Sequence, residues 1–213
     1  FHAGDVPVYI DSRDFVQVSS FLQYQGYYWI GNQFGLYRAP ITEGLKKDRI
    51  FSLSNQVTAN ATFGLLVNAG NIWAATGNGI ETFSATGARI PLTAGLLALQ
   101  NEVIYTILPD NQGMIWFAGN RGIGCLDTKT NHIINFTSRN NLQSLEFNSN
   151  ASCRAPDGRL FFGGIRGING FDPDWFSPAK RARKVSLLSL MVADRPFCEG
   201  VTPGSQDIIL NRK

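Results

Sequence analysis

Apolar residues along the chain occur in short runs of successive positions, and four of these runs recur with nearly constant spacing. The runs occupy residues 28–31, 72–75, 115–118 and 160–163, and each contains a bulky aromatic anchor. The anchors are Trp29, Trp73, Trp116 and Phe161, which lie 44, 43 and 45 residues apart. A repeat of this period is typical of stacked supersecondary units such as propeller blades.

Glycines bracket every anchor at fixed distances. One glycine lies three residues before the anchor and another lies six residues after it, and an aliphatic residue follows the second glycine each time. The eight glycines are Gly26, Gly70, Gly113, Gly158, Gly35, Gly79, Gly122 and Gly167. Because glycine adopts positive φ without steric penalty, these positions predict tight turns that enclose one short strand.

The enclosed strands are apolar on both faces, so both faces must be covered. In the third unit, residues 103–108 and 132–136 predict further strands, which makes each unit a four-stranded antiparallel meander. Sheets that are apolar on both sides can bury both faces by stacking around an axis, whereas the strands of a two-sheet sandwich alternate. In residues 92–102, the nearest approach to a helix, Gly95 favours a loop.

We therefore predict an all-β fold with four β-propeller blades, at about residues 11–50, 51–93, 94–138 and 139–178. The composition agrees with a sheet protein rich in turns, since the chain has 22 glycines and only 16% charged residues. No run of about 18 or more apolar residues is present, so we predict no membrane span. The chain opens on Phe1 without a leader pattern, and we expect it to be a piece of something longer.

Charge and cysteine content indicate little specific chemistry. The net charge is +3, and we interpret the basic run at residues 180–184 as a solvated linker, with a patch for phosphates or acidic sugars as the alternative. Cys125, Cys153 and Cys198 show no CxxC spacing. We expect buried, apolar cysteines and at most one disulfide.

The third unit carries a resemblance to a known family. Residues 110–123, which read DNQGMIWFAGNRGI, resemble the two-component regulator propeller repeat, with its Asp-containing turn, apolar–Trp pair and glycine–aliphatic step. Residues 146–151, 157–168 and 171–173 are similar to the closing propeller blade of hybrid two-component sensors of gut Bacteroidetes. Residues 185–192 and 208–210 resemble the beginning of the Ig-like domain (Y_Y_Y family) that follows such propellers.

The resemblance implies a place in a larger receptor. The four blades would be the last ones of a seven-bladed periplasmic propeller, and residues 179–213 would be a linker and an incomplete Ig-like domain, the start of a β-sandwich. Phe1 to Ile10 would be the outer strand of the preceding blade. In such receptors a further propeller lies upstream, and a membrane span, a histidine kinase and often a response regulator lie downstream. The chain would meet the membrane only through those missing parts.

The sequence offers few groups for catalysis, and we predict no catalytic residue, no metal site and no cofactor in this segment. His2 and His132 are the only histidines. Asp172 and Asp174 flank Pro173, a context typical of a turn. A polysaccharide-cleaving propeller enzyme is therefore the weakest of three functional hypotheses.

Ligand binding has more support. The turns after the anchor strands and the loops between blades should open on one face, here called the turn face, where amides and Arg side chains can bond sugar hydroxyls, sulfate or uronate groups. The predicted ligand-binding residues are Gln33, Asn78, Asn101, Asn120, Arg121, Asn141 and Arg166. Asn32, Arg139 and Asn140 also fall on this face. Ordinary solvated turn residues are the alternative for each of them.

These observations predict a periplasmic ligand-sensing segment that recognises a carbohydrate breakdown product and relays the signal across the membrane. The alternative is a propeller scaffold for protein–protein contacts without a small ligand. The expected partners are an oligosaccharide and, through the receptor ectodomain, a second copy in a homodimer. We predict no nucleic-acid partner.

Overall fold

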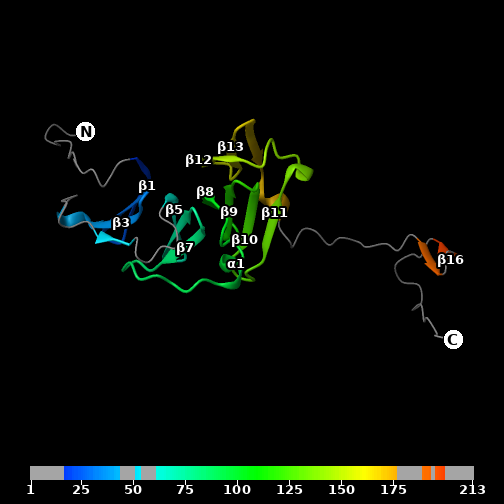
Figure 1. The fold of residues 1–213 in the computed structure, drawn as a ribbon, viewed down its shortest axis with the longest axis horizontal. Helices are drawn as coiled ribbons and strands as arrows, with labels where there is room; N and C mark the ends of the chain where they lie inside the picture. The colour runs from blue at the N-terminus through cyan, green and yellow to red at the C-terminus, as the bar shows by residue number, and fades with distance from the viewer. Residues whose placement is uncertain (1–16, 44–50, 54–60, 177–188, 193–194, 200–213) are drawn as a thin grey trace. The chain divides into compact units, whose positions relative to one another are not determined.

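The structure is a computed structural model of the chain, and it describes residues 17–43, 51–53, 61–176, 189–192 and 195–199. Contacts divide the chain into two units, residues 1–173 and residues 174–213. The regular structure described in the first unit is antiparallel sheet, apart from single helical turns (Figure 1).

Four antiparallel sheets follow one another along the described part of the first unit, and we call them blades 1 to 4. Blade 1 contains β1 (Val18–Tyr24), β2 (Tyr27–Asn32), β3 (Gly35–Pro40) and β4 (Phe51–Ser52). Blade 2 contains β5 (Thr62–Asn68), β6 (Asn71–Thr76) and β7 (Gly79–Phe83). Blade 3 contains β8 (Ile104–Pro109), β9 (Met114–Gly119), β10 (Ile123–Asp127) and β11 (Ile133–Phe136). Blade 4 contains β12 (Phe147–Arg154), β13 (Leu160–Gly164) and β14 (Gly167–Phe171).

Strand order in every blade follows chain order, so each blade is a meander and the predicted all-β propeller fold is confirmed. The prediction of four strands in each unit is wrong for blade 2, and blade 4 likewise has three strands in the part of the chain that the structure describes. In blade 2 the chain turns at Gly87 (φ 88°) and makes only an isolated bridge between Phe83 and Arg89 before Pro91. After β14, the chain continues as a 3-10 turn, Pro173–Phe176, up to the end of the described residues of this segment.

A short helix occupies part of the segment predicted to be a loop. Helix α1 (Ala94–Leu97) makes a single turn between blades 2 and 3. Gly95 lies within this helix. A larger residue would not fit there, because a Cβ would come 2.7 Å from the Asn131 carbonyl oxygen. Close approach to the β10–β11 turn therefore requires the glycine that had indicated a loop.

All eight turn glycines predicted from the repeat have positive φ, from 79° at Gly26 and Gly70 to 144° at Gly35. Gly122 (φ 107°) is also confined by space, since a Cβ there would lie 2.3 Å from the Phe136 carbonyl oxygen. Only glycine fits such a site without displacing the backbone. The regular glycines therefore set the turns of the blades.

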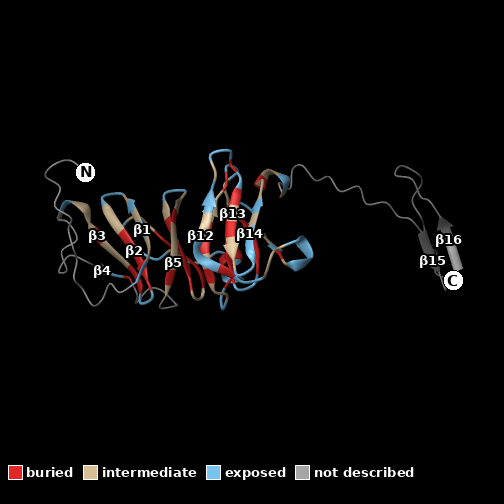
Figure 2. Ribbon diagram, turned by 90° about the horizontal axis from the view of Figure 1, so that it is seen from above, coloured by how far each residue is buried: buried red, intermediate tan, exposed pale blue. Residues whose placement is uncertain are grey.

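The three tryptophan anchors face the following blade. Trp29 is buried in one cluster with Ile72 and Phe83 of blade 2. The partly buried Trp73 packs against a cluster that includes Ile104 and Ile115 of blade 3. Trp116 is buried, and its ring centroid lies 4.8 Å from that of Phe171 in blade 4. Buried residues accordingly run along β2, β6 and β9, whereas β12 and β14 of blade 4 carry exposed residues (Figure 2).

The fourth anchor, Phe161, is only partly buried, since no described blade follows blade 4. Ile168 on the same sheet is 72% exposed. Cys153 pairs with Phe161 across the β12–β13 ladder and is exposed, so the expectation that it is buried is wrong. Cys125 is buried, as predicted. The side chain of Cys198 lies outside the described residues.

The first strands of the blades, β1, β5, β8 and β12, contact one another in succession. Hydroxyl groups add links between neighbouring blades: Ser19 donates a hydrogen bond to the Thr62 carbonyl, and Thr106 and Ser152 share one between their side chains. The stacking of blades along their first strands is therefore both apolar and polar.

In the second unit the structure describes one antiparallel hairpin of β15 (Ser189–Val192) and β16 (Arg195–Glu199). The assignment of residues 179–213 to a linker and an Ig-like domain stays a prediction. The predicted strands at residues 1–10 and 208–210 and the basic run at residues 180–184 lie outside the described residues. Within the described ranges, no helix has the length and apolar character needed to cross a membrane.

Candidate functional site

Turns and inter-blade loops are joined by an equivalent hydrogen bond in blades 2 and 3. The Gly79 amide donates to the Glu102 carbonyl at 2.7 Å, and the Gly122 amide donates to the Leu145 carbonyl at 2.8 Å. In each case the turn after the anchor strand meets the loop that leads to the next blade. In these two blades, the turn and the following loop therefore lie side by side, as expected for the turn face.

Several predicted ligand-binding residues meet around the loop that precedes β8. The Asn101 amide donates to Asn78 Oδ1 at 2.6 Å, and the Asn120 amide donates to the Val103 carbonyl at 3.4 Å. Arg121 Nη1 lies 3.0 Å from Glu102 Oε1. Residues 101–103 therefore bridge the turn of blade 2 and the turn of blade 3.

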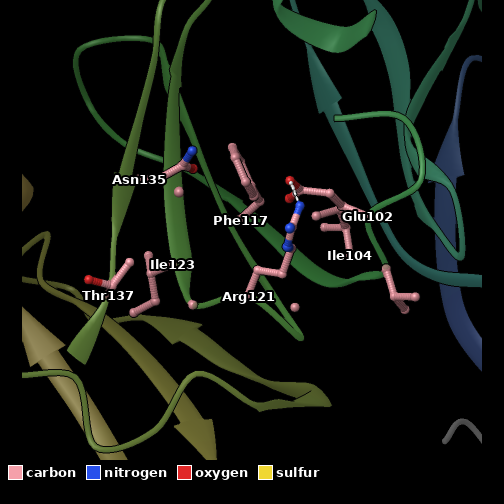
Figure 3. Close-up of a pocket in the computed structure, with 11 residues that line it drawn as sticks. Glu102, Ile104, Phe117, Arg121, Ile123, Asn135 and Thr137 are labelled. Carbon is pink, nitrogen blue, oxygen red and sulfur yellow. Dashed lines mark hydrogen bonds and ion pairs between the residues drawn. The ribbon is translucent and has the colours of Figure 1, made fainter. Parts of the chain in front are cut away.

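A pocket of about 180 Å³ lies beside this loop on blade 3. Its charged and polar side chains are Glu102, Arg121, Asn135 and Thr137, and its apolar side chains are Val103, Ile104, Phe117 and Ile123. In Figure 3 the Arg121 guanidinium reaches the Glu102 carboxylate, and the Phe117 ring lies between this pair and Asn135. The pocket combines an apolar floor with a polar rim.

Blade 3 departs from the other blades at the position that shapes this floor. Its strand β10 has Gly124 where blades 1, 2 and 4 have Tyr37, Glu81 and Asn169. Gly124 pairs with Phe117 across the sheet, and a Cβ on Gly124 would lie 2.1 Å from the Phe117 ring. The missing side chain leaves room for the Phe117 ring beside the β10 backbone.

In blade 2 the same place is filled by an ion pair. Glu81, 1% exposed, accepts from Arg89 Nε at 2.7 Å and from Arg89 Nη2 at 2.8 Å. The facing residue on β6 is Ala74, so the large and small partners are exchanged relative to Phe117 and Gly124. The repeat therefore builds a closed, charged contact in blade 2 and a pocket in blade 3.

The remaining predicted residues lie elsewhere on the turn face. Gln33 is exposed in the β2–β3 turn of blade 1. In blade 4 the Arg166 amide donates to Gln143 Oε1 at 2.7 Å, and Asn169 joins this group by donating to the Asn141 carbonyl at 3.1 Å. Asn141 and Arg166 are thus gathered around Gln143, apart from the blade 3 pocket.

Two residues placed on the turn face hold the backbone. Asn32 is fully buried, and its Oδ1 accepts from the amides of Phe34 at 2.7 Å and Gly35 at 3.0 Å. Asn140 Oδ1 accepts from the Thr137 amide at 3.0 Å in a capping box. Because Asn32 is fully buried, it does not fit a ligand-binding role; the bond at Asn140 uses one lone pair of its oxygen and leaves the role of this exposed residue open.

The pocket side chains that were not predicted from the sequence include Glu102, Phe117, Asn135 and Thr137. Glu102 had a visible signal, since it is a lone charge next to Asn101 in the predicted loop. Asn135 lies in β11 opposite Gly124, a pairing that the strand register decides, and Thr137 directly follows the strand. Of the predicted residues, Arg121 alone lines the pocket.

Two groups of blade 3 outside the pocket have shifted pKa values. Burial, with smaller effects from Asp110 and Asp127, raises the pKa of the Cys125 thiol far above its ordinary value. A hydrogen bond from the Thr130 side chain, followed by one from the Lys129 amide, lowers the pKa of Asp127 below 3.8. Across the described residues, no cluster of three or more His, Cys, Asp or Glu could hold a metal ion.

Comparison with known proteins extends from the repeat to the fold. Residues 98–121, which include Glu102 and Arg121, match the family described as two component regulator propeller. Histidine kinase P4 of Formosa agariphila is 26% identical over 109 residues, which are 51% of this chain and 8% of that protein.

Among solved structures, the extracellular domain of a putative hybrid two-component system of B. thetaiotaomicron is 26% identical with a TM-score of 0.65. The match covers 79% of this chain and 24% of that one. Virginiamycin B lyase from Staphylococcus aureus is 18% identical with a TM-score of 0.51, and the match covers 76% of this chain and 57% of that one. This likeness shows the fold alone. The chain thus spans only a fraction of these relatives. Residues 98–121 are a two-component regulator propeller repeat set among further blades of that fold, and the identification made from residues 110–123 is confirmed.

Proposed function

We propose that the chain is the extracytoplasmic ligand-sensing segment of a two-component sensor and that it recognises a carbohydrate in the blade 3 pocket. The observation that carries the proposal is the pocket itself, which places Arg121, Glu102 and Asn135 around the Phe117 and Ile104 side chains. Similarity to the extracellular domain of a putative hybrid two-component system supports the sensor role and the extracytoplasmic location.

The chemistry of the pocket matches that of a sugar. A pyranose ring presents apolar C–H faces and a periphery of hydroxyl groups, which need both donors and acceptors. The apolar floor suits the ring face, while Arg121, Asn135, Thr137 and Glu102 supply both kinds of polar group. A volume of about 180 Å³ is below the usual range for drug-sized ligands, roughly 300–1,000 Å³, and fits a single saccharide unit of a longer chain.

The loop beside the pocket gives a route for a conformational response. Residues 101–103 bond to the turns of both blade 2 and blade 3. A ligand that binds one arrangement of this loop more tightly than another shifts the population between the two. Relay across the membrane, through the rest of the parent protein, is part of the proposal.

We propose binding rather than turnover at this pocket. Glu102 is the one carboxylate among the residues that line it, and Arg121 already contacts that carboxylate. General acid–base hydrolysis of a glycosidic bond needs a pair of carboxyl groups in most enzymes. The pocket residues therefore suit recognition better than hydrolysis.

Calorimetric titration of the chain with a panel of neutral and acidic oligosaccharides tests this function. We expect saturable heat with at least one glycan and its loss in an Asn135→Ala/Thr137→Val variant, which removes the outer polar rim. Gln33→Ala is the matched control, because Gln33 is exposed on the turn face of blade 1, away from the pocket. No heat with any glycan contradicts the proposal and favours the protein-contact scaffold; equal loss in the control contradicts the location.

A further inference from the structure

The blade 3 pocket contains a cation whose partner is weakly held. Arg121 is 71% exposed and Glu102 is 17% exposed, and a single contact of 3.0 Å through Nη1 joins them. Resting on the proposed function, we propose that the ligand is a saccharide unit bearing a carboxylate or sulfate group, which replaces Glu102 at the Arg121 guanidinium.

The guanidinium geometry favours such an exchange. Arg presents its N–H groups in a planar fork that binds carboxylate and sulfate-like oxyanions through two parallel hydrogen bonds. The contact with Glu102 uses only one of these nitrogens. A ligand anion that engages two nitrogens therefore gains a bond relative to the resident carboxylate.

The chain itself provides the contrasting case. The Glu81–Arg89 pair of blade 2 makes two short contacts, and its carboxylate is buried. Displacing Glu81 would leave a buried charge uncompensated, which is strongly unfavourable. Glu102 lies at the end of its loop, two residues before β8, and its side chain is 17% exposed, so its carboxylate can turn to water when Arg121 is taken. One pair is therefore structural, and the other is exchangeable.

Exchange leaves the backbone of the pocket intact. The Glu102 carbonyl stays bonded to the Gly79 amide, and the Val103 carbonyl stays bonded to the Asn120 amide. Only the side-chain link between residues 101–103 and the blade 3 turn is released. The anion thus changes one connection of this loop without unfolding it.

Titration calorimetry with glucuronate, inorganic sulfate and glucose, in wild type and three variants, tests the exchange. We expect the wild-type chain to bind glucuronate and sulfate more tightly than it binds glucose. Arg121→Gln should weaken both anions about tenfold or more, because a charge-assisted bond is lost. Glu102→Gln should strengthen them roughly two- to fivefold, because the competing carboxylate is gone. Arg159→Gln is the matched control, since Arg159 also forms an exposed ion pair, with Asp157 at 2.8 Å, but does not line the pocket, and it should leave binding unchanged.

The outcomes separate this inference from the proposed function. Binding of glucose as tight as that of glucuronate, or anion binding unaffected by Arg121→Gln, overturns the exchange and leaves carbohydrate sensing standing. Sulfate binding that depends on Arg121, with no saccharide bound at all, overturns carbohydrate sensing and retains anion capture. No heat with any probe overturns both. Melting temperatures of the variants within a few degrees of wild type confirm that each one is folded.

Discussion

Asp110 holds the start of the anchor strand in blade 3, and its replacement should show how much one carboxylate contributes to a blade. The side chain is 8% exposed. Its Oδ1 accepts from the amides of Gln112 at 2.8 Å and Met114 at 2.9 Å, and its Oδ2 accepts from Trp116 Nε1 at 2.9 Å. The carboxylate thus fixes both the turn and the anchor indole.

Two substitutions separate these roles. Asp110→Asn keeps an oxygen for the turn amides but places an NH₂ group against the Trp116 N–H, so we expect a loss of about 1.5–3 kcal/mol in the free energy of unfolding. Asp110→Ala also removes the acceptor of the two turn amides, and we expect about 3–5 kcal/mol. Urea unfolding followed by circular dichroism measures both values.

A double-mutant cycle isolates the bond to the indole. In a Trp116→Phe background the N–H is absent, so Asp110→Asn should cost about 1–2 kcal/mol less than in wild type. Asp157→Asn, in the exposed turn of blade 4, is the control and should change stability little. Equal losses for Asp110→Asn in both backgrounds, or no loss at all, would refute the reasoning.

Three further predictions follow from single contacts. The lowered pKa of Asp127 means that its hydrogen bonds stabilise the folded chain above about pH 4 and lose this effect as the pH falls below 3.8. In urea unfolding, the difference in stability between wild type and Asp127→Asn should therefore shrink between pH 6 and pH 3. A difference that stays constant over this range contradicts the prediction. Burial keeps the Cys125 thiol protonated, so in a Cys198→Ser background a thiol reagent should label Cys153 quickly and Cys125 only after denaturation; two fast thiols in the native chain are the contrary result. Gly79→Ala places a side chain at a φ of 95°, with its Cβ 2.7 Å from the Leu99 carbonyl oxygen, whereas a Cβ at Gly26 would have no atom within 4 Å. Gly79→Ala should therefore lower the free energy of unfolding by at least about 1 kcal/mol more than Gly26→Ala. Equal shifts of the melting temperature would count against the steric argument.

The repeat was readable from the sequence because glycine and the aromatic anchors each have one strong physical role. Gly35 and Gly79 mark turns at positive φ, and Trp29 and Trp116 mark buried strands that meet the next blade. These features are local and periodic, so spacing alone reveals them. Fourth strands were harder to predict, because blade 2 ends in a turn and a single backbone bridge, beside the Arg89–Glu81 ion pair, and neither contact follows the repeat.

The pocket was only partly predictable. Arg121 was found because its residue type and its place in a turn both indicate binding. Phe117 looked like an ordinary core residue, and its role as a floor depends on facing Gly124 across the sheet. Comparison of equivalent positions in the four units, where only blade 3 has this glycine, contains the signal. Asn32 was placed among the possible ligand contacts because the sequence does not show that its side chain is buried. In the structure its Oδ1 accepts from the Phe34 amide and holds the turn.

Residue-level mapping of a bound saccharide tests the central claim most directly. An ¹⁵N-labelled chain titrated with glucuronate should show amide shifts concentrated at residues 102–104, 117–124 and 135–137, which line or flank the blade 3 pocket. Shifts that saturate at this group, and vanish in Arg121→Gln, are the result that the account predicts. Shifts confined to the exposed side of blade 4 around Phe161, or no shifts at saturating ligand, would contradict it.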